Sequence, residues 1–163
     1  MSSRFCASIR IGGQIKRSNV EPWLKEIRTA ALSLEWGDAP FLPQNADELL
    51  DGRKDKYLWL CDEQANYGEF PELEAACRKL GLSYSRHGEA SFDCDAELAD
   101  WRPGMKEPLV RTGSNINSHD TYVPMDAVRK AVALLEAGQP DKAFGALRKV
   151  CPNIPELPPF EIV

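Results

Sequence analysis

Carboxylates are the side chains of this sequence whose types and spacing are best suited to chemistry. Asp62 and Glu63 follow an apolar segment, and Asp93, Asp95 and Glu97 alternate along a later stretch. Carboxylates brought together from two strand ends can act as a glycosidase pair or bind Mg²⁺. Alternating acidic residues on one face of a strand are also typical of a solvated or protein-binding surface. We favour the surface interpretation and keep a hydrolase as the alternative.

Metal and thiol chemistry have less support. The two histidines, His87 and His119, form no HExxH motif, and the five cysteines form no CxxC pair. Cys94 and His87 are the best candidates in the sequence for a thiol beside a base, but neighbouring carboxylates would raise the pKa of the Cys94 thiol. We therefore expect no metal, no cofactor and no catalytic residue.

The acidic residues are concentrated in one block of the chain. Between Asp62 and Glu107 lie eleven acidic and five basic residues, a net charge of −6, whereas the rest of the chain carries +1. Such a block repels nucleic acid and anionic membranes and attracts basic proteins. The predicted partner is therefore a basic protein surface, without direct binding to nucleic acid or to a membrane.

Aromatic residues are interleaved with the acidic ones in this block. Aromatic side chains often supply most of the binding energy of a protein interface, inside a polar rim. We therefore expect three aromatic anchors, with carboxylates around them providing charge complementarity. The predicted partner-binding residues are Tyr67, Glu69, Tyr84, Asp93, Asp95, Glu97 and Trp101.

The elements that position these residues follow from hydrophobic periodicity and from turn residues. Strand-like segments are 5–11, 57–61, 83–86 and 91–94, and helical spacing covers 20–34 and 71–80. Helices alternating with short strands predict an α+β body over residues 1–111. We expect a small mixed or antiparallel sheet with helices on one face, in a ferredoxin-like or split β-α-β arrangement.

The C-terminal third has a different pattern. Pro124 and Pro140 begin two amphipathic segments joined by a Gly-Gln-Pro turn, which predicts a helical hairpin over residues 122–151. We expect this hairpin to pack on the body and the Pro-rich tail, residues 152–163, to extend across the surface. Apolar hairpin residues left exposed would instead indicate an oligomeric scaffold.

Length and hydropathy indicate the class of protein. A chain of 163 residues suits one domain, or one domain with a small appendage. No stretch approaches the ~18 apolar residues of a membrane helix, and the first residues lack the layout of a signal peptide. We expect a soluble, cytoplasmic protein.

Part of the acidic block resembles small acidic proteins that are carried by phages, plasmids and integrated mobile elements. The resembling features are the strand end Cys61–Glu63, the turn Tyr67–Phe70, the strand Leu82–Arg86 and the exit Trp101–Gly104. The resemblance covers under a third of the chain and brings no catalytic residue with it. It implies a mobile-element accessory protein, a class that includes inhibitors of host defence.

The leading prediction combines the charge pattern with this resemblance. It is a non-enzymatic acidic module that binds and inhibits a basic, nucleic-acid-handling host defence complex, of the anti-CRISPR or antirestriction type. The alternative is a hydrolase that uses the carboxylates named above, with or without Mg²⁺, on a phosphate or sugar substrate.

Overall fold

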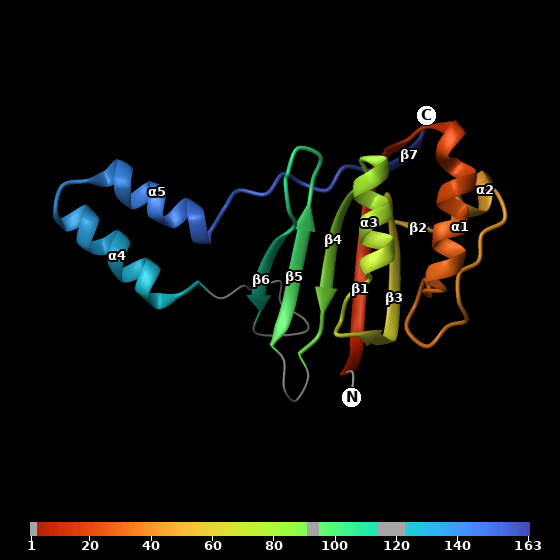
Figure 1. Ribbon diagram of the computed structural model, residues 1–163, viewed down its shortest axis with the longest axis horizontal. Helices are drawn as coiled ribbons and strands as arrows, with labels where there is room; N and C mark the ends of the chain where they lie inside the picture. Colours follow the sequence, from red (N-terminus) through yellow and green to blue (C-terminus); the bar gives the residue numbers. More distant parts are fainter. Residues whose placement is uncertain (1–2, 91–94, 114–122) are drawn as a thin grey trace.

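The fold is an antiparallel sheet with helices on one face, as the sequence predicted (Figure 1). A computed structural model describes residues 3–90, 95–113 and 123–163. Six strands run in the order β2-β3-β1-β4-β5-β6, and a seventh, β7, pairs in parallel with β1. Strands β3 and β4 are parallel to each other with β1 between them, and α3 connects them. This connection is a split β-α-β unit, so the α+β fold class is confirmed.

The element bounds show where the sequence pattern was followed. The strands are β1 Arg4–Ile15, β2 Arg53–Lys54, β3 Tyr57–Asn66, β4 Ser83–Gly88, β5 Ala96–Trp101, β6 Leu109–Gly113 and β7 Phe160–Ile162. The helices are α1 Val20–Ala30, α2 Ala46–Asp51, α3 Pro71–Leu80, α4 Met125–Glu136 and α5 Pro140–Val150, with a 3₁₀ turn at Arg17–Asn19. The strand expected over residues 91–94 lies outside the described residues, and β5 follows it.

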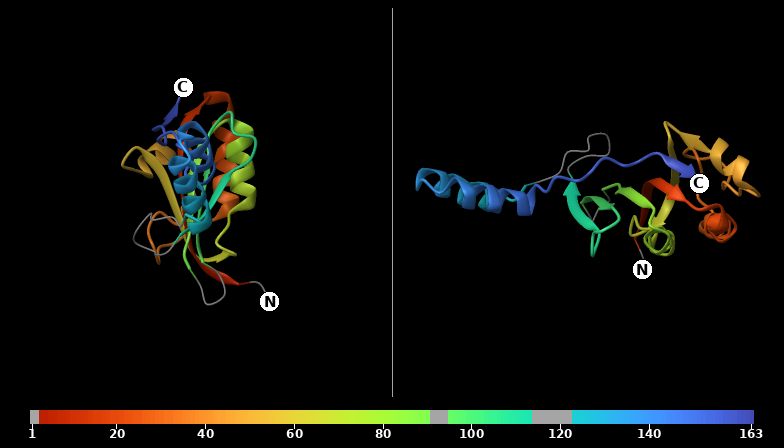
Figure 2. Two further views of the ribbon diagram at one scale, coloured as in Figure 1. Left: turned by 90° about the vertical axis from the view of Figure 1, so that its left-hand side faces the viewer. Right: turned by 90° about the horizontal axis from the view of Figure 1, so that it is seen from above.

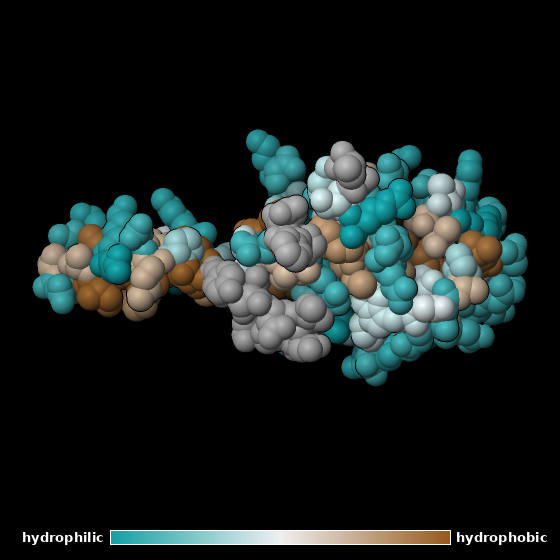
Figure 3. Space-filling model, turned by 90° about the horizontal axis from the view of Figure 1, so that it is seen from below, coloured by the Kyte–Doolittle hydropathy of each residue, from teal (hydrophilic) through white to brown (hydrophobic). Residues whose placement is uncertain are grey.

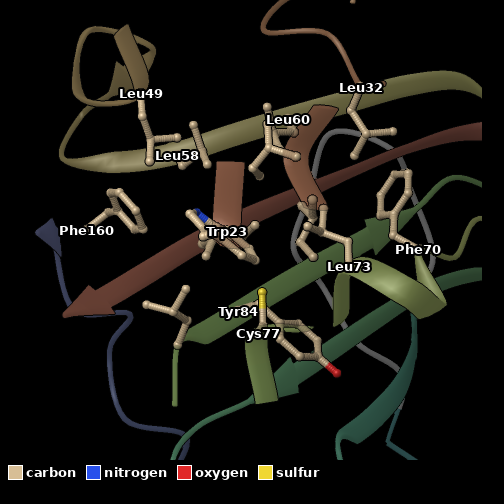
Figure 4. Close-up of a cluster of buried hydrophobic side chains, with 14 of the residues drawn as sticks. Trp23, Leu32, Leu49, Leu58, Leu60, Phe70, Leu73, Cys77, Tyr84 and Phe160 are labelled. Atoms are coloured by element: carbon tan, nitrogen blue, oxygen red, sulfur yellow. The ribbon is translucent and has the colours of Figure 1, made fainter. Parts of the chain in front are cut away.

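Helices α1 and α3 cover one face of the sheet, and the core lies between them and the strands (Figures 1 and 2). Helix α1 buries Trp23, Leu24 and Ile27 because they recur at helical spacing. Helix α3 ends at Gly81, whose φ of +73° is the left-handed conformation expected of a C-terminal glycine. Trp23 lies at the centre of the buried cluster (Figure 4).

The end of the tail belongs to the body of the protein. Phe160 in β7 is completely buried and packs with Leu49 and Leu58 in the core cluster (Figure 4). The amide of Gly13 donates to the carbonyl of Pro159 at 2.9 Å. The sequence predicted an extended tail on the surface, but its last residues complete the sheet and the core.

The hairpin formed by α4 and α5 stands beyond β6, clear of the sheet (Figures 1 and 2). This placement differs from the expectation that the hairpin packs on the body. Within the hairpin only Ala131 and Ala143 are buried. Exposed large apolar residues are Met125, Val132, Leu135 and Phe144. Figure 3 shows hydrophobic surface on this part of the chain.

No helix in the described part of the chain is long and apolar enough to cross a membrane.

Candidate functional site

One end of the sheet gathers several of the predicted binding residues. We call Tyr67, Glu69, Glu89, Asp95 and Glu97 the acidic end. Tyr67 and Glu69 lie in the turn between β3 and α3, Glu89 follows β4, and the other two lie at the start of β5. The turn rests directly on the end of β4, because a Cβ added to Gly88 would lie 3.2 Å from the carbonyl oxygen of Gly68.

A buried arginine holds the acidic end together. The Arg86 side chain is only 3% exposed. Its Nη1 donates to the carbonyl of Gly68 at 2.7 Å, its Nε lies 2.9 Å from Glu74 Oε1, and its Nη2 pairs with Glu97. One guanidinium therefore connects the turn, the first part of α3 and the start of β5. This fixes the turn that carries Tyr67 and Glu69 relative to Glu97.

Two of the predicted anchors are core residues. Tyr84 is completely buried, and its hydroxyl donates to Glu74 Oε2 at 3.0 Å. Trp101 is also buried, and its Nε1 donates to the carbonyl of Met105 at 3.1 Å. The two residues face each other across β4 and β5, on the side of the sheet that the helices cover. The prediction that they contact a partner is therefore corrected.

The remaining predicted residues are placed differently. Tyr67, Glu69 and Asp95 are exposed, while Glu97 is partly exposed and paired with Arg86. Asp93, with Cys94 beside it, lies outside the described residues. The structure thus brings Tyr67, Glu69, Asp95 and Glu97 to one end of the sheet.

Asp62 and Glu97, two of the carboxylates considered for a hydrolase, are not adjacent. Asp62, Ala7, Gly88 and Glu97 follow one another in register across β3, β1, β4 and β5. Three strand spacings of ~4.8 Å separate Asp62 from Glu97 by about 14 Å. Glycosidase carboxyl groups lie roughly 5–9.5 Å apart. Among the described residues no cluster of His, Cys, Asp or Glu could hold a metal ion.

The described cysteines near these carboxylates are poor nucleophiles. Burial, reinforced by Glu35, Glu63, Asp62 and Asp38, raises the pKa of Cys61 to about 11. Burial, followed by the charge of Glu89, also raises the pKa of Cys6. Because the thiolate is the reactive form, both thiols stay protonated and weakly reactive near neutral pH.

The opposite face of the sheet, which α1 and α3 leave uncovered, carries a groove that the sequence did not predict. Its volume is about 720 Å³. Arginines, aromatic residues and serines line it, and the C-terminal tail passes along it; the main lining residues are Arg10, Trp36, Tyr57, Trp59, Ser85, Asp100, Arg102, Arg111 and Leu157.

A polar network forms part of the groove wall. Asp100 Oδ1 accepts a hydrogen bond from the Ser85 hydroxyl at 2.5 Å and lies 3.5 Å from Arg102 Nη2, while its Oδ2 pairs with Arg111. Arg102 also donates to the carbonyl of Pro155 at 3.0 Å, which ties the tail to the groove.

Sequence reasoning missed this groove because its arginines are far apart along the chain. They come from β1, β4, β6 and the residue after β5. Basic residues that are this dispersed along the sequence do not indicate a patch. The alternation of side chains along the strands could have indicated the groove. Residues that oppose each other in the register, such as Arg10 and Trp59, share the polar side of otherwise apolar strands.

No family model, curated protein or solved structure matches this chain.

Proposed function

We propose that the protein is a non-enzymatic binding module whose acidic end docks on a basic protein surface. The observation that carries this proposal is the grouping of exposed Tyr67 with carboxylates from three separate segments, held over buried Arg86. Opposite charge would steer the partner toward this end, and Tyr67 would supply the central contact.

The proposed anchor is held by backbone geometry. Tyr67 is 51% exposed and has a φ of +53°. Its amide donates to the carbonyl of Ser3 at 2.8 Å, and the amide of Glu69 donates to the carbonyl of Asn66 at 3.1 Å. A side chain presented by a fixed turn loses less conformational entropy when it binds.

We further propose that the partner is a basic, nucleic-acid-handling complex of a host defence system, and that this protein is a cytoplasmic accessory factor of a mobile element that inhibits it. The net charge of −5 and the resemblance of the middle block support this class of partner. Anionic side chains would compete for the surface on which such a complex binds nucleic acid.

The test compares charge reversal at the acidic end with the same charge change elsewhere. Glu69→Lys/Asp95→Lys should abolish capture of a basic, nucleic-acid-binding protein from a bacterial lysate, because the reversed charges repel the partner. Asp47→Lys/Asp51→Lys on α2 is the matched control and should retain capture. With the captured protein purified, wild-type association should slow as salt rises. Equal capture by both variants, or association insensitive to salt, would contradict the proposal.

Self-association through the hairpin is a second candidate, favoured by the exposed apolar residues of α4 and α5. Two short helices with only two buried alanines between them gain little from their own packing. Pairing with the hairpin of a second copy would complete a four-helix bundle. The end joined to the body is net basic (Arg129, Lys130, Arg148 and Lys149 against Asp126), whereas the tip is net acidic (Glu136 and Asp141 against Lys142). An antiparallel pair would therefore bring opposite charges together.

The mass of the protein in solution tests this candidate. We expect light scattering to give the mass of a dimer for the wild type and of a monomer for Val132→Glu/Phe144→Glu, because buried carboxylates would disfavour the bundle. Leu42→Glu, an equally exposed position on the body, should remain dimeric. A monomeric wild type at all concentrations would refute self-association.

A further inference from the structure

Arg10 in the groove has hydrogen-bond donors with no partner. It is half-buried on β1, and its guanidinium carbon lies over the Trp59 ring, 5.1 Å from the ring centroid. None of its side-chain N–H groups donates to another described residue, and its guanidinium forms no ion pair within the described chain. The N–H groups of a guanidinium form a fork that matches a carboxylate or phosphate.

Two more residues that line the same groove carry unpaired donors. Trp59 Nε1 and Arg111 Nε are buried and have no hydrogen-bond partner among the described residues. Buried donors in folded proteins are nearly always paired, and each unpaired one costs free energy. The three residues that carry these donors, on β1, β3 and β6, thus line one cavity. The Trp59 and Arg111 nitrogens are themselves buried, so the half-buried Arg10 is the unpaired donor of this set that a bound acceptor could reach.

The charges of the groove select an anion as that acceptor. Arg86 lines the groove but already pairs with Glu74 and Glu97. The lining also holds the guanidinium groups of Arg10, Arg102 and Arg111 and the carboxylate of Asp100. Arg102 and Arg111 share this carboxylate, and no described carboxylate forms an ion pair with Arg10. Two further carboxylates, on Glu89 and Glu156, lie along its lining. The acidic balance of the whole chain opposes a long polyanion such as nucleic acid, which favours a small ligand.

Aromatic walls and volume define the rest of the ligand. Trp36, which is 42% exposed, and Tyr57 line the groove together with Leu157 of the tail. A volume of about 720 Å³ lies within the range of small-molecule sites, roughly 300–1,000 Å³. We propose that this groove binds a small organic anion with a flat ring. Its carboxylate or phosphate would bind Arg10, and its ring would pack against Trp36 and Tyr57.

The four tryptophans allow a direct test by NMR of their indole N–H groups. Benzoate and phenyl phosphate are the probes, and they distinguish a carboxylate from a phosphate ligand. At least one should shift the Trp36 and Trp59 resonances saturably, while Trp23 and Trp101, in the core, should not move. Benzamide, which keeps the ring without the charge, and inorganic phosphate, which lacks the ring, should each bind at least about tenfold more weakly.

Arg10→Gln should weaken binding of the responding probe about tenfold or more, because a charge-assisted hydrogen bond is lost. Arg17→Gln, at an exposed arginine outside the groove, should bind like the wild type. Unchanged Trp23 and Trp101 resonances in both variants would show that the fold is intact. Absence of a saturable shift with both anions, equal binding of benzamide, or full binding by Arg10→Gln would each overturn the proposal.

Discussion

Replacing Phe160 with alanine is expected to lower the free energy of unfolding by about 3–5 kcal/mol, the range for removing a buried aromatic side chain. Phe160 is completely buried, although it lies only three residues from the end of the sequence. Its amide donates to the carbonyl of Lys56 at 2.8 Å, and its carbonyl accepts from Arg53 Nη1 at 3.0 Å. The truncated residue would leave a cavity beside Leu49 and Leu58. Urea unfolding followed by circular dichroism measures the loss.

Val163→Ala is the matched control for Phe160→Ala. Val163 is 53% exposed and its backbone bonds are kept, so the free energy of unfolding should change by less than about 0.5 kcal/mol. Hydrogen exchange should show faster exchange of the Val163 amide, which bonds to the carbonyl of Ile15, in Phe160→Ala alone. A Phe160→Ala protein as stable as the control would mean that the tail is not part of the core.

Replacing Arg86 with glutamine is expected to destabilise the protein by about 3–5 kcal/mol, because a buried carboxylate would lose its partner. Glu74 is buried, and besides Arg86 it meets the Tyr84 hydroxyl and, at 3.3 Å, the amide of Phe70. The carbonyl of Gly68 would also lose its donor. Urea unfolding measures the effect, and hydrogen exchange should increase in the turn at residues 66–69.

A double-mutant cycle separates the ion pair from general damage to the site. In Arg86→Gln/Glu74→Gln no charge is left uncompensated, so the double variant should be more stable than the sum of the two single losses predicts. Lys79→Gln, at an exposed position on the same helix, should change stability by less than about 0.5 kcal/mol. Strictly additive losses in the cycle would show that Arg86 and Glu74 do not stabilise each other.

The two proposed ligands of this protein occupy different places. A basic partner would meet the acidic end, where strands β3 and β4 finish, whereas the small anion would lie on the open face of the sheet between Trp36 and Arg111. Glu89 is the residue that both places share. Charge reversal at Glu69 and Asp95 therefore tests the first proposal without altering the lining of the groove.

Local patterns in the sequence determined the main elements of the body. Helix α1 follows from the spacing of Val20, Trp23, Leu24 and Ile27, and α3 from Pro71 at its start with Gly81 after its end. These signals depend on neighbouring residues alone, so they can be read along the chain. The predicted extension of the first helix to residue 34 is wrong, because the chain leaves the helix at Ala31, whose φ is +51°.

Tertiary structure alone decided which residues of the acidic block face solvent. From the sequence we expected Tyr84 and Trp101 to be surface anchors. The register of β4 against β5 instead turns both side chains toward the helices. The sequence concentrated the carboxylates in one block. Only the packing of the Gly68 turn on Gly88, over Arg86, brought Tyr67 and Glu69 next to the start of β5.

The groove and the buried end of the tail also depend on contacts between residues that are far apart in the sequence. Composition and periodicity determined an acidic α+β protein with two amphipathic C-terminal helices. The register across β3, β1, β4, β5 and β6 placed four arginines from distant segments around one cavity. The parallel pairing of β7 with β1 buried Phe160. Both results depend on contacts between residues far apart in sequence, which hydrophobic periodicity does not encode.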